Sequence, residues 1–501
     1  MQCCPLGHHN QSVQKNASRI ALYRADQVRE IERAAIAAGI PAVQMMRRAA
    51  DAGWQLIQRR WPEARRIHVL AGPGNNGGDG LWLAALARQA GRSVSIAEVT
   101  GGDRSDAANQ AREQARCAGV DWVEATASLP VADLYVDALF GIGLARAPGG
   151  LAAQWIKALN GLAAPVLSLD VPSGLDADTG GAQGAVVRAT VTLSFVAWKQ
   201  GLFTGRARAC CGELLLDGLA IPPDMMPHTE IVLLAPPPMA MRARDAHKGS
   251  FGHVLVIGGS TGFSGAAWLA GEAALRTGAG LVSLAIAPAG LPAAMAHRPE
   301  LMVHCVGDAS GLVVPLARAS VLAVGPGLGQ LAWSAGLLDA ALAAGKPLVL
   351  DADALNLLAR VPRTLPPECV ITPHPGEAAR LLGCTTETIE ANRFAAAVDL
   401  AKHTGAVVVL KGAGTLVACG SGRIEVCSEG NPGMASGGTG DVLTGMIAAL
   451  RAQGLAAWDA ARLGVSLHAR AGDRAAQAGG ERGMIASDLL PHVRMLVNRT
   501  V

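Results

Sequence analysis

Residues 67–91 read IHVLAGPGNNGGDGLWLAALARQAG, and this order of residue types predicts a strand, a glycine-rich turn and a helix. The run IHVLA is short and apolar, which is typical of a strand that is buried on both faces. Glycines and asparagines interrupt the run, and the apolar spacing of LWLAALARQA is helical. A strand that leads through a tight turn into a helix is the repeating unit of a parallel α/β sheet.

The same unit recurs along the first half of the chain. SVSIAEV (93–99), LYVDALFG (134–141) and VLSLDVPSG (166–174) are apolar runs of strand length, and the last two lead through an aspartate to a glycine. Ahead of these runs, apolar residues at helical spacing predict a helix at residues 25–40 and a second helix after Pro41. We therefore predict a parallel sheet with crossover helices, in which ligands bind outside the carboxyl ends of the strands.

A proline-rich stretch divides the chain. Residues 219–244 contain six prolines and little periodicity, which predicts a linker. A second α/β series follows: HVLVIGGS (253–260), LVSLAIA (281–287), VLAVGPGLG (321–329), PLVLDADAL (347–355), CVITPHPGE (369–377) and AVVVLKGAGT (406–415). We predict two α/β domains at residues 20–218 and 245–501, joined by this linker and preceded by a disordered tail at residues 1–19.

Composition excludes several classes of protein. The net charge of the 501-residue chain is only +3 and no basic stripe stands out, so we expect no nucleic-acid partner. No uninterrupted apolar run reaches the roughly 18 residues of a membrane span, and the first residues lack the apolar region of a signal peptide. The ten cysteines form no CxxC pair, so we expect reduced thiols in a cytoplasmic enzyme without a membrane partner.

The strongest chemical signal is SGGTGD (436–441), which runs directly into the apolar helix VLTGMIAALRA. Its glycines leave backbone N–H groups free to converge, and the helix N-terminus adds positive partial charge, so the loop predicts a phosphate site. KGAGT (411–415) supplies a second such loop with a cation and a hydroxyl. Asp441 falls in the first helical turn, where a carboxylate is either a favourable charge at the helix dipole or a group that acts in phosphoryl transfer.

These residues resemble the ribokinase-like superfamily, in which the aspartate of GxGD activates the acceptor hydroxyl. HKGSFGHVLVIGGS (247–260), GFSGAAWLAGEAALRTGAGLV (262–282), VGPGLG (324–329), LDADALN (350–356), TPHPGE (372–377) and NPGMASGGTGD (431–441) are similar to nucleotide-dependent NAD(P)H-hydrate dehydratases. The similarity spans residues 246–490 and implies a ribokinase-like α/β/α domain. Lys248 is either a phosphate contact or a plain loop charge.

The resemblance implies a role for each matching residue. Asp441 would be the catalytic base that takes the proton of the C6 hydroxyl, whose oxygen then attacks the terminal phosphate of the nucleotide. Loss of phosphate restores the dihydropyridine, with ADP as the usual bacterial co-substrate, AMP as its product and Mg²⁺ bound to the nucleotide. The expected nucleotide contacts are Lys411, Gly412, Ala413, Gly414, Thr415 and Gly440, and the expected substrate contacts are Ala266, Gly327, His374 and Asp441. His374 alone would read as a strand-end histidine between two prolines.

The glycine loop of the first half has a different chemistry. It is neither GxGxxG nor a P-loop, because no GK[ST] follows it. Asn75, Asn76 and Asp79 offer oxygens, and Asp137 and Ser173 follow two other predicted strands, so the set suits a hard cation. Asn, Asp and Ser also favour ordinary turns and caps, which is the alternative interpretation.

GPGNNGGDGL, VDALFGIGLAR and LDVPSGLDADTG resemble the NAD(P)H-hydrate epimerases over residues 22–216, a family with a Rossmann-like α/β/α sandwich that binds K⁺ and interconverts R and S hydrates. The resemblance implies Asn76, Asp137 and Ser173 as K⁺ ligands and Asp170 as the acid/base. The implied substrate contacts are Asn75, Asn76, Gly77, Gly78, Asp79, Gly141, Ile142, Gly143, Leu144, Ala145, Arg146, Ala147 and Asp170. MMRRAA (45–50) departs from the family's usual glutamate and Arg-Ala-Gly run, which puts the contacts of that helix in doubt.

Together the halves resemble the bifunctional NAD(P)H-hydrate repair enzymes, since a dehydratase that acts on one epimer needs an epimerase for the other. We expect NADH and NADPH hydrates and ADP as substrates, and a homo-oligomer. The alternative is a ribokinase-like small-molecule kinase with an N-terminal binding module, which would leave a stable phosphorylated product.

Overall fold

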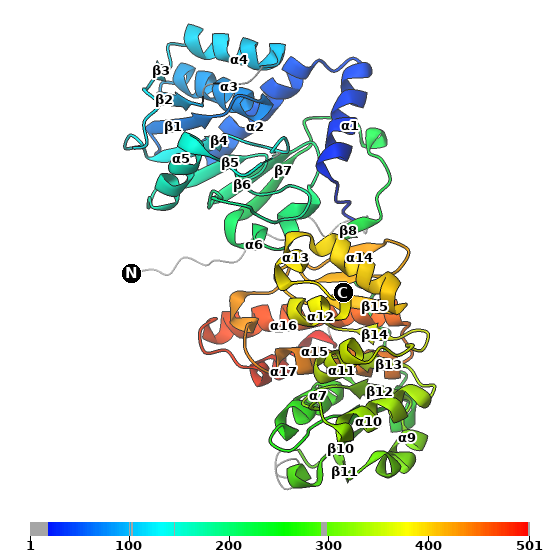
Figure 1. Ribbon diagram of the computed structural model, residues 1–501. Helices are drawn as coiled ribbons and strands as arrows, with labels where there is room; N and C mark the ends of the chain where they lie inside the picture. The colour runs from blue at the N-terminus through cyan, green and yellow to red at the C-terminus, as the bar shows by residue number, and fades with distance from the viewer. Residues whose placement is uncertain (1–18, 100, 102–103, 145, 292–297, 499–501) are drawn as a thin grey trace.

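The computed structural model describes residues 19–99, 101, 104–144, 146–291 and 298–498 as two α/β domains, the first at the top of Figure 1 and the second below it. The tail expected at residues 1–19 lies outside the described residues except for Arg19, and Ala145 also lies outside them. No helix in the described part of the chain is both long enough and apolar enough to span a bilayer.

The first domain is built on a seven-stranded sheet in which every neighbouring pair of strands is parallel, as the sequence predicts. Its strands, in chain order, are β1 (Arg66–Ala71), β2 (Ser93–Glu98), β3 (Asp121–Trp122), β4 (Leu134–Ala138), β5 (Val166–Leu169), β6 (Val191–Phe195) and β7 (Glu213–Asp217). The spatial order is β3-β2-β1-β4-β5-β6-β7, so the direction of winding reverses between β1 and β4. Such a reversal opens a crevice at the carboxyl ends of the two strands.

The helices of the first domain are α1 (Ala25–Ala37), α2 (Ala42–Arg60), α3 (Asn75–Gln89), α4 (Asp106–Cys117), α5 (Gly150–Asn160) and the short α6 (Ala207–Cys210). The helix predicted at residues 25–40 is α1. Helix α3 begins earlier than expected, because Asn75 to Gly80 form its first turns instead of a loop. The reason is close packing: a Cβ at Gly77 would lie 2.0 Å from the carbonyl oxygen of Gly72, and one at Gly80 would lie 2.4 Å from the Cβ of Ala138.

The second domain is built on a ten-stranded sheet in the order β11-β10-β9-β12-β13-β14-β15-β16-β17-β8. Its strands are β8 (Ile231–Leu233), β9 (His253–Ile257), β10 (Leu281–Ile286), β11 (Met302–Cys305), β12 (Val321–Val324), β13 (Leu348–Leu350), β14 (Val370–Ile371), β15 (Val407–Leu410), β16 (Leu416–Ala418) and β17 (Ile424–Val426). The predicted parallel series holds from β9 to β15, whereas β16 runs antiparallel to β15 and β17. Residues 411–415 join β15 to β16 as a short hairpin loop, which only an antiparallel pair permits.

The helices of the second domain are α7 (Ser264–Thr277), α9 (Val313–Arg318), α10 (Ala332–Ala343), α11 (Ala352–Arg360), α12 (Pro375–Leu382), α13 (Thr386–Ala391), α14 (Arg393–Thr404), α15 (Thr439–Ala452), α16 (Ala457–Gly479) and α17 (Leu489–Leu496). They cover both faces of the sheet, because alternate strand residues point to opposite sides. Leu255 and Ile257 belong to one buried cluster, with α10, α11 and α14, and Val254 and Val256 to another, with α7, α15, α16 and α17. The domain is therefore a three-layer α/β/α sandwich, as expected.

The stretch predicted as a linker is not irregular throughout. It contains a 3₁₀ turn, η2 (Pro223–Met225), and the edge strand β8, which pairs in parallel with β17. The start of the first domain runs along the same edge, where the N–H of Leu22 donates to Ile231 O at 2.9 Å and that of Leu233 donates to Ile20 O at 2.9 Å. Backbone pairing at the sheet edge satisfies groups that a free linker would leave to water. The domain limits themselves stay a prediction.

Candidate functional sites

The first site lies where the winding of the first sheet reverses. The loops that follow β1 and β4 approach so closely that a Cβ at Gly72 would lie 1.7 Å from the carbonyl oxygen of Leu139. Beside them opens a cavity of about 1480 Å³. Ten of the expected contacts line it: Asn75, Asn76, Asp79, Gly141, Ile142, Gly143, Leu144, Arg146, Ala147 and Asp170. Residues from three distant segments of the chain thus meet at one crevice.

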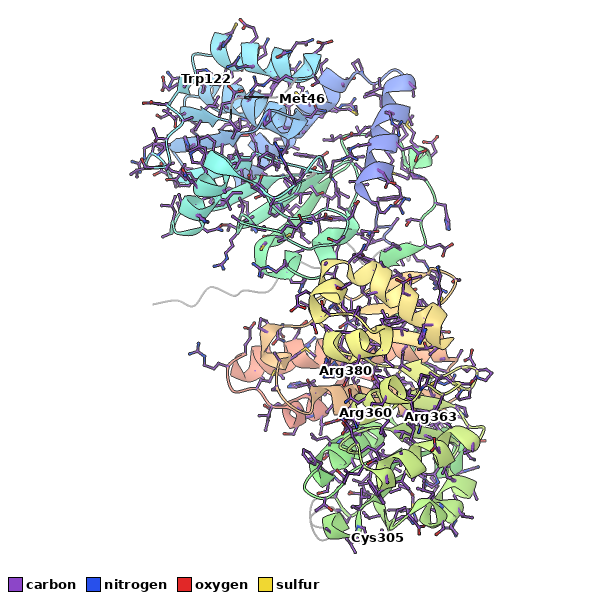
Figure 2. All side chains as sticks on the ribbon, in the orientation of Figure 1. Met46, Trp122, Cys305, Arg360, Arg363 and Arg380 are labelled. Atoms are coloured by element: carbon purple, nitrogen blue, oxygen red, sulfur yellow. The ribbon has the colours of Figure 1, made fainter. Side chains whose placement is uncertain are left out.

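Two of the expected contacts have another role. Gly77 packs against the backbone of Gly72, and a Cβ at Gly78 would lie 2.6 Å from the side chain of Met46. Met46 comes from α2 and is labelled in Figure 2. Neither glycine lines the cavity, so their contribution is to let α3 pack closely against its neighbours. Ala145 falls outside the described residues, so its expected contact is not placed.

Asp137 and Ser173 are fully buried and are hydrogen-bonded to each other. Ser173 donates to Asp137 through its hydroxyl at 2.6 Å and its N–H at 2.9 Å, and Ser168 Oγ donates at 2.8 Å. Burial raises the pKa of Asp137, although these hydrogen bonds offset part of the effect. Asn76 is also buried, and neither its amide nitrogen nor its oxygen has a hydrogen-bond partner among the described residues. An unpaired buried amide marks a place for a polar or charged ligand.

Asp170 follows β5 and reaches the cavity from an unusual backbone conformation. Its φ of 65° lies in the left-handed region, which is costly for a residue other than glycine. Lys199 is only 1% exposed, and its ammonium donates to Asp170 Oδ1, to Ser194 Oγ at 3.0 Å and to Phe195 O at 2.6 Å. Every proton of the ammonium therefore has an acceptor. The lysine fixes one carboxylate oxygen and leaves the other near the N–H of Ile142, at 3.3 Å.

Two further carboxyl groups, those of Asp79 and Glu32, line the same cavity. Burial and the charge of Asp170 raise the pKa of Asp79 well above its ordinary value. Burial and Asp170 likewise raise the pKa of Glu32, against the opposing charges of Lys199 and Arg29. A raised pKa favours the protonated form of a carboxyl group, so Asp79 and Glu32 are candidate proton donors beside Asp170. The sequence did not identify Glu32 or Lys199, because neither lies in a motif that sets it apart from ordinary helix and loop residues.

The second site lies where the carboxyl ends of β12 to β15 face the start of α15. The winding of this sheet reverses between β9 and β12. Gly327 follows β12 with a φ of 58°, and a Cβ there would lie 3.1 Å from that of Ala266 on α7. The fold therefore brings together two residues that the sequence separates by about sixty positions.

Asp441 lies in the first turn of α15, as predicted. Burial raises its pKa to about 7, and the charges of Asp351 and Glu377 add to this effect while Lys411 opposes it. A carboxylate that only complemented a helix dipole would have its charged form favoured, which lowers a pKa. A carboxyl group with a pKa near neutrality is a candidate proton acceptor at that pH.

Lys411 connects Asp441 to a buried polar network. Its ammonium lies 2.6 Å from Asp351 Oδ1 and 3.9 Å from Glu377 Oε2, and Thr444 Oγ1 donates to Asp351 Oδ2 at 2.7 Å. Burial lowers the pKa of Lys411, but Asp351, Glu377 and Asp441 outweigh it and raise the pKa above its ordinary value. The lysine therefore stays charged and presents a fixed cation beside Asp441.

His374 caps the start of α12 and is half exposed. Its Nδ1 accepts from the N–H of Gly376 at 3.0 Å, which places the proton of a neutral ring on Nε2, 3.4 Å from Glu377 Oε1. Burial and the charge of Lys411 lower the pKa of His374. Burial raises the pKa of Glu377 to about 7. A neutral imidazole at the edge of the cluster fits the substrate contact expected of it, and it also acts as a helix cap.

The loop 411–415 has the backbone of a phosphate site. Gly412 and Gly414 have φ values of 139° and 71°, which favour glycine. Within the described residues, the backbone N–H groups of Gly412, Ala413 and Gly414 donate to no other group. A Cβ at Gly440 would lie 3.2 Å from Lys411 Nζ, so the two expected nucleotide loops adjoin. Free N–H groups beside a lysine are what a phosphate requires.

The sequence missed three members of this network. Asp351 and Glu377 lie within LDADALN and TPHPGE, but no role was predicted for them, and Thr444 lies in a helix whose pattern reads as apolar. Asp353, which accepts from the N–H of Gly329 at 2.9 Å and fixes the loop after β12, was also missed. An aspartate that directly follows a predicted strand was the available signal.

Comparison with known proteins matches both halves of the chain. A family model described as NAD(P)H-hydrate dehydratase matches residues 254–494, and one described as YjeF-related protein N-terminus matches residues 42–201. The bifunctional NAD(P)H-hydrate repair enzyme Nnr of Coxiella burnetii is 44% identical over 95% of this chain and 99% of its own. The proteins of the same name from Escherichia coli and Vibrio cholerae are 41% and 40% identical, over 96% and 95% of this chain and 94% and 98% of theirs.

Proposed function

The chain belongs to the family of bifunctional NAD(P)H-hydrate repair enzymes, and on that premise we propose which of its two sites performs each half of the repair. The cavity of the first domain epimerises the R and S hydrates of NADH and NADPH. The cluster around Asp441 in the second domain dehydrates the S epimer to NAD(P)H at the expense of ADP, which yields AMP and phosphate. One observation carries the assignment: Asp441, whose pKa burial raises to about 7, lies beside the ammonium of Lys411 and a loop of free N–H groups.

Dehydration needs a base, an electrophile and a place for the phosphate charge. Asp441 accepts the proton of the C6 hydroxyl, and the freed oxygen attacks the terminal phosphorus, whose bond to the bridging oxygen breaks and releases AMP. The phosphorylated hydrate then loses phosphate from C6 and a proton from C5, which forms the C5–C6 double bond. Lys411 and the N–H groups of residues 412–414 neutralise the phosphate charge, and Mg²⁺ bound to the nucleotide would supply further positive charge there.

Epimerisation needs a base and an acid on the same substrate. The C6 atom of the hydrate bears both an oxygen and the ring nitrogen, so opening and reclosing of the C6–N bond inverts it. Asp170, fixed by Lys199, accepts the hydroxyl proton, and Glu32 or Asp79, whose protonated form burial favours, supplies a proton to the nitrogen. Reclosure on the other face of the carbonyl carbon returns both protons and gives the opposite epimer.

The residues present also fit the K⁺ that the family resemblance implies. Asn76 has a buried amide without a partner among the described residues, and Asp137 and Ser173 add a carboxylate and a hydroxyl. The donor set is made of oxygens with one formal negative charge, which suits a hard monovalent cation. In the described part of the chain, no group of three or more His, Cys, Asp or Glu side chains could hold a metal ion. The bound cation would supply positive charge next to the substrate loops after β1 and β4.

Nucleotide binding is expected to stabilise the protein. A ligand that binds only the folded state at a hundredfold excess over its Kd contributes about 2.7 kcal/mol, which raises the Tm of a domain of this size by roughly 5–10 °C. Thermal unfolding with and without millimolar ADP measures this shift. The Asp137→Ala protein, altered in the other domain, should show the same shift, and a wild-type protein that shows none would contradict the nucleotide site.

Dehydration is expected to slow in acid. Because burial raises the pKa of Asp441 to about 7, the base becomes protonated as the pH falls through that value, and kcat/KM should drop about tenfold for each further pH unit. The pH profile of kcat/KM between pH 5 and 9 tests this. Glu377 titrates in the same range, so Glu377→Gln is the control, and an acid limb that vanishes in this variant would assign the titration to Glu377 instead.

A further inference from the structure

The first domain reaches directly onto the nucleotide loop of the second. Thr204 and Gly205, which follow the 3₁₀ turn η1 (Gln200–Phe203), lie against residues 413 and 414. The N–H of Gly205 donates to Ala413 O at 2.9 Å, and Thr204 Oγ1 lies 2.9 Å from Gly414 O and 3.2 Å from Ala413 O. Figure 1 shows this part of the first domain, near α6, beside α13 and α14.

The contact is close-packed and buried. Thr204 is fully buried. A Cβ at Gly414 would lie only 2.1 Å from Phe203 O, so the two backbones touch where the loop passes the first domain. Phe203 and Leu22 of the first domain belong to the same buried apolar cluster as Ile389 and Phe394 of the second. An apolar interface of this kind restricts relative motion of the domains.

Arg393, at the start of α14, forms hydrogen bonds with both Thr204 and the nucleotide loop. Its side chain is 1% exposed, and its Nε donates to Thr204 Oγ1 at 3.0 Å. Its Nη2 donates to the carbonyl oxygens of Leu410 and Lys411 at 3.2 and 3.1 Å, and its Nη1 to Glu390 at 2.9 Å. The hydroxyl of Thr204 therefore accepts from the arginine and donates to the loop, which links the three parts in one hydrogen-bonded chain.

These contacts fix which way the peptides of the loop face. The carbonyls of Leu410, Lys411, Ala413 and Gly414 accept hydrogen bonds from Arg393, Thr204 or Gly205, and that of Gly412 accepts from Thr415 Oγ1 at 3.1 Å. The N–H groups of residues 412–414 are left without partners in the described structure. An anion needs N–H groups, and a peptide flipped in the opposite sense would present a carbonyl oxygen and repel it.

We propose that Thr204 and Arg393 are positioning residues for ADP in the second domain, and that the first domain thereby holds the phosphate loop in its binding orientation. The inference rests on the proposed role of residues 411–415 in nucleotide binding. Neither side chain contacts the reacting atoms. Their effect is to engage the carbonyl side of the loop, so that the N–H side is preorganised for phosphate before the nucleotide arrives.

The test is a set of threonine variants of the full chain. Thr204→Val keeps the volume but removes the hydroxyl, which leaves Arg393 Nε without its acceptor and frees the loop to reorient. We expect the KM for ADP to rise about tenfold, the amount that one lost buried hydrogen bond gives, with a smaller change in kcat. Thr204→Ser keeps the hydroxyl and should restore the wild-type KM, and epimerisation should be unchanged in both variants.

The matched control is Thr192→Val. Thr192 is equally buried in the first domain, and its hydroxyl donates to a backbone carbonyl, that of Cys211, at 2.7 Å. It lies in β6 and its hydroxyl bonds within the first domain, so its removal should lower stability without raising the KM for ADP. An equal rise in both valine variants would overturn the proposal, because loosening of the fold would then explain it.

A direct loop variant separates this inference from the proposed function. If Thr415→Ala raises the KM for ADP while Thr204→Val does not, residues 411–415 bind nucleotide and the positioning role is wrong. If ADP binding measured by calorimetry is unaffected in both, the loop is not the nucleotide site and both proposals fall. Arg393→Lys, which keeps the charge but loses the fork of donors, replaces Thr204→Val should that protein not fold.

Discussion

Asp441→Asn is expected to lower the dehydration rate at least a hundredfold, or about 2.7 kcal/mol of barrier, and to leave epimerisation unchanged. The amide keeps the size of the carboxylate and can still accept hydrogen bonds at the helix start, but it cannot take the hydroxyl proton. ADP affinity should persist or increase, because a negative charge beside the phosphates is removed. Both rates, ADP binding and the Tm are measured on this one protein.

The stability of the same variant gives an independent check with a defined sign. Because burial raises the folded-state pKa of Asp441 to about 7, the unfolded state ionises first, and this group costs stability increasingly as the pH rises from about 4 to about 7. Asparagine removes that cost, so the Tm at pH 8 should match or exceed that of the wild type.

Asp459→Asn is the matched control for Asp441→Asn, since Asp459 lies in the first turn of α16 and is no part of the cluster. It should retain full dehydration. A well-folded Asp441→Asn protein with near-normal dehydration, or one that loses stability as Asp459→Asn does and nothing else, would reduce Asp441 to a charge at a helix dipole.

Asp137→Ala is expected to abolish epimerisation, with a rate at least about a hundredfold below that of the wild type, while dehydration of the S hydrate continues. The variant removes the carboxylate that we propose as a K⁺ ligand. It also leaves the buried N–H of Ser173 unpaired, so the protein should lose roughly 1–3 kcal/mol of stability yet stay folded. Loss of both activities in a protein that is still folded would contradict the assignment of separate sites.

Asn76→Ala separates cation binding from stability. The amide of Asn76 makes no hydrogen bond with the described residues, so its removal should change the Tm little, whereas loss of a ligand should reduce epimerisation. K⁺, compared with tetramethylammonium at constant ionic strength, should raise the Tm of the wild type but not that of Asn76→Ala or Asp137→Ala. A folded Asn76→Ala protein that keeps both the epimerisation and the K⁺ effect would exclude Asn76 as a ligand.

The local pattern of residues was enough to predict that both domains are α/β. Apolar runs of strand length predicted β1, β2, β4 and β5 of the first sheet and β9, β10 and β12 to β15 of the second, and the α/β class of both domains followed from them. The strands β3, β6, β7, β8, β11, β16 and β17 were not predicted. The position of Asp441 in a first helical turn could also be read directly, because a glycine loop and an apolar helix adjoin it in the chain. The pattern did not predict where α3 begins, because close packing decides it. The helix begins at Asn75, within the stretch expected to be a loop, because its glycines allow neighbouring backbones to approach.

The partners of the key groups were decided by tertiary structure alone. Lys411 and Asp351 are 60 residues apart, and Arg393 and Thr204 are 189 residues apart and in different domains. Strand order, not sequence separation, places the carboxyl ends of β13 and β15 on either side of β14, where the strands end at the same edge of the sheet. The spacing of apolar residues shows which face of a helix or strand is buried. Which charged side chains meet depends instead on which elements become neighbours in the fold. The raised pKa of Asp441 follows from its burial and from the charged groups that the fold places around it.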